Sequence, residues 1–214
     1  MTEFQQVPIA YGVKLVFSDG TAVNWYRDSR RKTVFAEKNP AGHVFPRSAE
    51  KLEQILAVLE GGAPEVTRDD AGRGIGAFDG GADPNPGIGG WGVVLPDGGE
   101  LSGTEPHTTN NRMELTALIE AYKALPPDAE TTIFSDSEIC VKTINEWAAG
   151  WEARGWRRKT GPIKNLELVQ ELYRLARAHP RVTLRWIRAH DGSRWNEYVD
   201  ALANAYMLRG GGVR

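Results

Sequence analysis

Strand-like and helix-like hydrophobic patterns follow one another between residues 74 and 208 in an order that few folds can accommodate. Short runs rich in β-branched and aromatic residues predict strands, and apolar residues at three- and four-residue spacing predict helices. We expect strands at 74–80, 90–95, 99–104, 131–135 and 182–188, and helices at 111–125, 138–150, 165–178 and 197–208. A three-strand meander followed by strand–helix–strand crossovers predicts an α/β fold, with a mixed five-stranded sheet flanked by helices.

A stretch rich in glycine, proline and charged residues precedes this region, at 61–73, and has no hydrophobic period. Such a composition is typical of a linker. We therefore expect two domains, at 1–60 and 74–209, and a flexible glycine-rich tail at 210–214.

The N-terminal domain has its own sequence of patterns. Strands are predicted at 13–17, 22–26 and 33–36, and the first two flank an Asp19-Gly20 turn signal. Apolar residues at helical spacing predict a helix at 49–59. The expected structure is a small α+β domain of order βββα.

Composition excludes several classes of protein. The 214-residue chain has no apolar run that approaches a membrane span, which needs roughly 18 residues. Its start lacks the basic and apolar blocks of a secretory signal. Because Cys140 is the only cysteine, an internal disulfide and a zinc finger are excluded. We expect a soluble, cytoplasmic protein with no membrane partner.

The net charge of −2 does not exclude a nucleic-acid partner, because local potential decides phosphate binding. The segment from Arg154 to Lys164, both included, contains five basic residues and no acidic one. This segment is a candidate surface for a phosphate backbone.

Four acidic residues occupy informative positions. Asp79 lies within or at the end of the first strand of the larger domain, Asp136 follows the strand at 131–135, and Glu114 and Asp200 lie in first turns of helices. Strand ends and helix N-termini can converge on one crevice, where carboxylates repel one another unless a cation lies between them. Oxygen ligands favour Mg²⁺ or Mn²⁺, which can activate water for phosphodiester hydrolysis. Spacing alone equally allows these residues to serve turns and helix N-termini.

The residues around these carboxylates resemble type 1 ribonuclease H. The similarity covers about 75–208, and its four motifs occur in the order of that family. They are FDGGADPNPGIGGWG at 78–92, TTNNRMEL at 108–115, SDS at 135–137, and His190 with Asn196, Glu197 and Asp200.

The resemblance implies an endoribonuclease that hydrolyses the RNA strand of RNA–DNA hybrids and leaves 5′-phosphate and 3′-hydroxyl ends. Asp79, Glu114, Asp136 and Asp200 would hold two Mg²⁺ ions, for which Mn²⁺ could substitute. His190 would be a fifth catalytic residue that assists proton transfer or product release. The alternative function is a non-catalytic RNA–DNA hybrid-binding protein that retains the fold. A binder, however, needs no repulsive cluster of carboxylates.

The resemblance also implies contacts to the hybrid substrate. Asn85, Asn110 and Asn111 match positions that touch its minor groove and backbone, and Thr109 matches a position that holds a DNA phosphate. The asparagines would also suit a turn and a helix cap. Residues 147–159 resemble a basic protrusion of the family, here called the handle, which would grip the DNA strand. Its candidate contacts are Trp156, Arg157, Arg158 and Lys159.

Two residues depart from the pattern of the family. Glu138 stands where many members carry a glutamine that contacts RNA, and Glu152 reduces the positive charge of the handle. Neither residue replaces a carboxylate of the expected metal site. We also expect Trp91 and Trp186 in the core and Cys140 buried in its helix.

The N-terminal domain has two candidate roles. A basic and aromatic cluster could hold a nucleic-acid backbone and stack on a base or sugar. It comprises Trp25, Tyr26, Arg27, Arg30, Arg31 and Lys32. The domain's charges nearly cancel, however, and its aromatics could equally pack against the helix. The other role is contact with a second copy of the chain or with a different protein.

Overall fold

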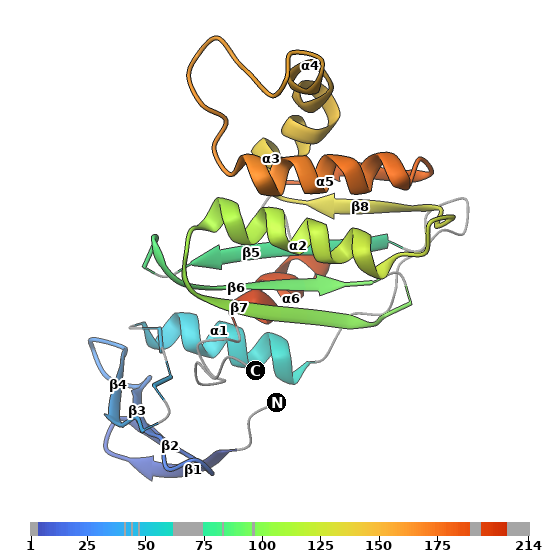
Figure 1. Ribbon diagram of the computed structural model, residues 1–214. Helices are drawn as coiled ribbons and strands as arrows, with labels where there is room; N and C mark the ends of the chain where they lie inside the picture. Colours follow the sequence, from blue (N-terminus) through green and yellow to red (C-terminus); the bar gives the residue numbers. More distant parts are fainter. Residues whose placement is uncertain are drawn as a thin grey trace. The chain divides into compact units, whose positions relative to one another are not determined.

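The structure is a computed structural model that describes residues 4–61 apart from 41, 44 and 47, residues 75–95 apart from 83, and residues 97–188 and 194–204. The chain divides into two compact units (Figure 1). The first holds the described residues up to 61 together with Asn204, and the second holds those from 75 to 203. The predicted linker, apart from Gly61, and the predicted tail lie outside the described residues.

The first unit is a four-stranded antiparallel sheet and one helix. The strands are β1 (Phe4–Ile9), β2 (Gly12–Phe17), β3 (Ala22–Tyr26) and β4 (Thr33–Lys38), in that order across the sheet, and α1 spans Ala49–Glu60. Alternate residues of β2 are buried, so one face of the sheet packs on α1. The core between them is formed by Val13, Leu15, Phe17, Val23, Trp25, Ala49, Leu52, Ile55 and Leu56.

The first unit has four strands, one more than the predicted βββα order. Strand β1 was missed because its sequence, FQQVPI, shows no apolar alternation and contains Pro8. Proline removes a donor from the strand ladder, and it is tolerated at the edge of a sheet, which is where β1 lies. The three predicted strands and the helix are confirmed.

The second unit confirms the expected mixed five-stranded sheet, with strand order β7-β6-β5-β8-β9. The antiparallel strands are β5 (Ile75–Ala82), β6 (Gly87–Val94) and β7 (Glu100–Thr108). Strands β8 (Thr131–Ser135) and β9 (Val182–Trp186) continue the sheet in parallel with β5.

Helices cover both faces of this sheet. Helix α2 (Asn110–Ala124) crosses in front of β5 and β6, with α5 (Leu166–Ala178) beside it, and α6 (Arg194–Asn204) lies behind the strands (Figure 1). The main hydrophobic core is formed by apolar residues of α2, α5 and the sheet, such as Leu118, Leu172 and Ile133. None of the helices among the described residues is both long and apolar enough to cross a membrane.

The helix predicted at 138–150 has an irregular centre. It consists of α3 (Glu138–Lys142), the π-helical segment η1 (Thr143–Trp147) and α4 (Ala148–Glu152). A π-helical turn accommodates an extra residue relative to an α-helical turn. Apolar spacing indicates a helix here without revealing the irregular turn.

Candidate active site

The backbone places Asp79 and Asp136 side by side on two neighbouring central strands of the second sheet. Strands β5 and β8 are parallel, and Phe78 lies opposite Ser135 in their register. Asp79 is the next residue within β5, and Asp136 is the first residue after β8. Residues at neighbouring positions of two parallel strands lie side by side, and the carboxyl ends of such strands are the usual place of sites in these folds.

Helix α2 brings Glu114 to the same place through a close approach at Gly80. A Cβ atom added to Gly80 would lie 2.4 Å from the carbonyl carbon of Met113 and 2.7 Å from the backbone nitrogen of Glu114. No side chain fits between strand and helix at that distance, so a glycine is required. The backbone of Glu114 therefore lies against the residue that follows Asp79.

Helix α6 approaches the same region from strand β6. Asp79 pairs with Gly92 across the β5–β6 ladder. A Cβ atom on Gly92 would lie 3.0 Å from both the carbonyl oxygen of Val199 and the backbone nitrogen of Ala203. Asp200 lies in the segment between these two residues. The backbones that carry all four predicted carboxylates thus converge.

The side chains of Asp79 and Asp200, and the whole of His190, lie outside the described residues. In the described part of the chain, no group of three or more histidine, cysteine, aspartate or glutamate side chains could hold a metal ion. Only Glu114 and Asp136 among the expected ligands have described side chains, so the four-carboxylate metal site stays a prediction.

The Glu114 carboxylate is half-buried and held by two neutral donors. The Ser137 hydroxyl donates to its Oε2 atom at 2.5 Å, and the Cys140 thiol approaches the same oxygen at 3.7 Å. Burial raises the pKa of Glu114, the Ser137 hydrogen bond lowers it, and the negative charge of Asp136 raises it again. The two carboxylates therefore lie close enough to repel each other.

Cys140 is buried, as expected, and it is a thiol rather than a thiolate. Burial is the main cause that raises its pKa to about 12, and the charge of Glu114 also contributes. The thiol keeps its proton at neutral pH, so it can donate a weak hydrogen bond but is a poor nucleophile.

Trp186 supports the segment that carries Asp136. Its indole N–H donates to the backbone carbonyl of Asp136 at 3.0 Å, and the N–H of Ile187 donates to the carbonyl of Ser135, also at 3.0 Å. The prediction that Trp186 is a core residue was wrong, because the residue is 43% exposed at the end of an edge strand. Trp186 lies opposite Ser135, the residue before Asp136, in a strand register that the sequence pattern does not reveal.

The asparagines expected to contact substrate lie around the start of α2 and the β5–β6 turn. Asn85 and Asn111 are exposed. The Oδ1 atom of Asn110 accepts the N–H of Ala82 at 2.8 Å, which ties the helix to the end of β5. Thr109, rather than Asn110, is the N-cap residue, and its side chain makes no capping hydrogen bond. The alternative reading of Asn110 as a helix cap is therefore wrong.

The basic side chains of the handle are exposed. Arg157, Arg158 and Lys159 form no ion pair with any other residue in the described part of the chain, although Arg158 Nε donates to the carbonyl of Gly161 at 3.1 Å. Trp156 is half-buried against the core, and its ring meets Tyr173 edge-on at 6.0 Å. The positive charges thus remain available to a polyanion, while much of the Trp156 ring packs within the protein.

The two departures from the motifs are both offset by ion pairs. The Glu138 carboxylate lies 2.7 Å from Lys142 Nζ, and the Glu152 carboxylate lies 3.0 Å from Arg177 Nη1. These pairs are exposed and contribute little to stability. Their local effect is to reduce the negative charge that each glutamate adds.

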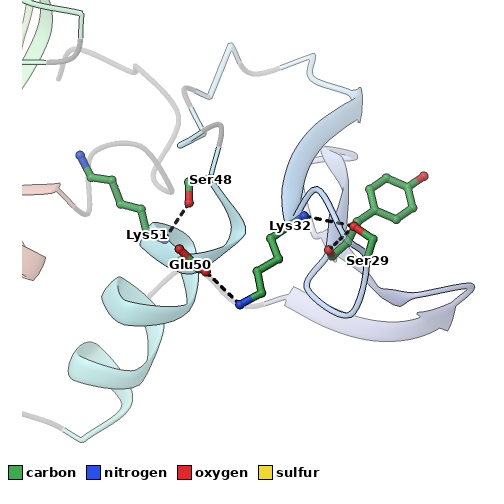
Figure 2. A network of polar contacts seen from close by, with 6 residues as sticks. Ser29, Lys32, Ser48, Glu50 and Lys51 are labelled. Carbon is green, nitrogen blue, oxygen red and sulfur yellow. Dashed lines mark hydrogen bonds and ion pairs between the residues drawn. The ribbon is translucent and has the colours of Figure 1, made fainter.

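The basic and aromatic cluster of the first unit is partly engaged within the unit. Trp25 is 4% exposed and packs in the core, and the guanidinium of Arg27 lies 5.2 Å from the centre of its ring. Figure 2 shows Lys32 Nζ bound to the Glu50 carboxylate at the start of α1, a contact of 2.8 Å. Neither the nucleic-acid role nor the partner role of this unit is tested by these contacts.

Comparison with known proteins gives a match to a protein family and to several individual proteins. The RNase H family model matches residues 76–207. Over 128 residues the chain is 52% identical to ribonuclease H of Methylorubrum extorquens (strain PA1), which covers 58% of this chain and 56% of that relative. The chain thus spans little more than half the length of that relative.

Two further matches cover more of their proteins. Over 130 residues the chain is 48% identical to ribonuclease H of Cupriavidus necator (strain ATCC 17699), with 59% of this chain and 89% of the relative covered. Among solved structures, the crystal structure of LC9-RNase H1, a type 1 RNase H with the type 2 active-site motif, has a TM-score of 0.53 and 30% identity. It covers 69% of this chain and 76% of that one.

Proposed function

The chain belongs to the ribonuclease H family, and from this premise we propose that it is a nuclease that hydrolyses the RNA strand of RNA–DNA hybrids. The observation that carries the proposal is the convergence of four acidic backbone positions around the central strands of the second sheet, through Gly80, Gly92 and the β5–β8 register. A protein that only binds hybrids would gain nothing from such a cluster, because gathered carboxylates repel a polyanion.

The surroundings of the Glu114 and Asp136 carboxylates suit a hard divalent cation. The described hydrogen-bond donors to Glu114 are neutral, and the neighbouring Asp136 adds negative charge that a cation would offset. We propose that Asp79, Glu114, Asp136 and Asp200 hold two Mg²⁺ ions, with Mn²⁺ as a substitute. When bound, such a pair supplies Lewis acidity at both the attacking and the leaving side of the phosphodiester.

Substrate binding and proton transfer are assigned to other side chains of the protein. The exposed amides of Asn85 and Asn111 are suited to hydrogen bonds with ribose hydroxyls and backbone atoms in the minor groove. The handle supplies positive charge for the DNA strand. His190 is proposed to move a proton at the departing oxygen. The expected products carry 5′-phosphate and 3′-hydroxyl ends.

Cleavage of end-labelled RNA–DNA hybrid tests the proposal, with RNA duplex, DNA duplex and single strands as competing substrates. Asp136→Asn should nearly abolish cleavage and leave hybrid binding intact, because it removes a ligand charge and leaves the handle unchanged. Asp97→Asn is the matched control, because Asp97 serves a turn by accepting the N–H of Gly99 at 2.9 Å. Near-normal cleavage by Asp136→Asn would contradict the metal-site assignment. Tight hybrid binding without cleavage by the unchanged protein would decide for the non-catalytic alternative.

A further inference from the structure

We propose that Ser137 and Cys140 are positioning residues that fix the carboxylate of Glu114 for metal binding. The inference rests on the proposed function, because it takes Glu114 as a ligand. Both donors reach the same atom, Oε2, from the start of α3. Both contacts therefore hold one oxygen of the carboxylate, Oε2, rather than Oε1.

The Ser137 hydroxyl is committed to Glu114 rather than to its own helix. Ser137 occupies the N-cap position of α3, where a serine normally accepts an N–H from the first turn. It makes no side-chain capping bond, and its hydroxyl donates to Glu114 instead. A stabilising capping interaction is therefore absent at this position, which helix stability alone does not explain.

The geometry of this hydrogen bond is that of a strong, charge-assisted contact. The 2.5 Å separation between the Ser137 and Glu114 oxygens lies in the range of a hydroxyl bound to a carboxylate. Ser137 is 6% exposed, and its own N–H donates to the Ser135 hydroxyl at 3.2 Å. The donor is thus held in place by a second buried serine at the end of β8.

Cys140 adds a weaker donor one turn further along the helix. Its thiol is 2% exposed and lies 3.7 Å from Oε2. A thiol is a weak donor, so its contribution is smaller than that of the hydroxyl. Together the two groups restrict rotation of the Glu114 carboxylate about its last bond. A carboxylate fixed in this way loses less conformational freedom when it binds an ion.

Groups that orient metal ligands commonly change metal affinity or activity by about 10–100-fold when removed. Ser137→Ala should therefore weaken Mg²⁺ binding by about tenfold, as measured by calorimetric titration of the full chain without nucleic acid. In cleavage assays the half-saturating Mg²⁺ concentration should rise in parallel, while the KM for hybrid stays unchanged. Ser137→Thr keeps the hydroxyl and should restore most of the affinity. Cys140→Ala should have a smaller effect, and Cys140→Ser should reverse it.

Thr116→Val is the matched control, because it also removes a hydroxyl from the region of Glu114. The Thr116 hydroxyl donates to the carbonyl of Arg112 at 2.8 Å, within α2 itself. Its loss should leave Mg²⁺ affinity unchanged. Equal affinity of Ser137→Ala and the unchanged protein would overturn the inference, as would a loss in Ser137→Ala that Ser137→Thr does not restore.

The titration also separates this inference from the proposed function. If the unchanged protein binds Mg²⁺ but does not cleave hybrids, and Ser137→Ala weakens binding, the positioning role holds and the proposed function fails. If hybrids are cleaved and Ser137→Ala changes neither affinity nor metal dependence, the positioning role fails alone. An unchanged protein that binds neither Mg²⁺ nor Mn²⁺ overturns both the positioning role and the metal site.

Discussion

Replacement of Gly80 by alanine should damage both stability and cleavage through one contact. The added Cβ would lie 2.4 Å from the Met113 carbonyl carbon, 1.0 Å short of the 3.4 Å at which ordinary contact begins. The obstructing atoms are backbone, so β5 and α2 must move apart. Overpacking of this kind costs about 1–3 kcal/mol of unfolding free energy. A displacement of about 1 Å at a catalytic group can cost about 100-fold in rate.

Urea unfolding and single-turnover cleavage of hybrid measure the two effects of Gly80→Ala. The adjacent Gly81→Ala is the control, since a Cβ atom at Gly81 meets no heavy atom within 4 Å. Both substitutions reduce the flexibility of the unfolded chain equally, so their difference reports the contact with α2. If Gly80→Ala unfolds and cleaves like Gly81→Ala, then close packing of α2 on β5 does not position Glu114.

Two further predictions concern charge. Replacing Arg157, Arg158 and Lys159 together with alanine should raise the KM for hybrid and reduce the slope of log affinity against log salt by about 2 to 3, because fewer counterions are released; an unchanged slope would exclude the handle as the DNA contact. In the first unit, the hydrogen bond from His43 and that from the Thr21 backbone lower the pKa of Asp19 from 3.8 to about 2. A lowered pKa stabilises the folded state above pH 3.8, and this contribution is lost as the pH falls through about 2. The difference in unfolding free energy between the protein and Asp19→Asn should therefore shrink over that interval in urea titrations; a difference independent of pH would contradict the assignment.

The order of the second unit was predictable because its strands and helices carry strong hydrophobic periods. The irregular features were not. Strand β1 has no alternation, and the π-helical segment η1 preserves the apolar spacing of an ordinary helix. Both β1 and η1 depend on tertiary contacts, which the local pattern of apolar residues does not indicate.

The candidate site also has some features that the sequence predicts and others that it does not. The neighbouring positions of Asp79 and Asp136 follow from parallel strands, so spacing predicted them. The hydroxyl of Ser137 and the indole of Trp186 act across elements distant in sequence. Residue type alone suggests a helix cap for the first and a core residue for the second. Such contacts are decided by register and rotamer, which a single sequence does not reveal.

The pairing of β5 with β8 has a consequence for how the protein folds. Ile75 and Thr132 are partners although 57 residues separate them, whereas β5, β6 and β7 pair with neighbours in sequence. Closing a long loop costs chain entropy before any contact compensates for it, so sheets with distant pairings form slowly. The meander can assemble early, but Asp79 and Asp136 come together only after β8 has docked. A partly folded chain, including one still emerging from the ribosome, would therefore lack the neighbouring positions of Asp79 and Asp136 on which the proposed function depends.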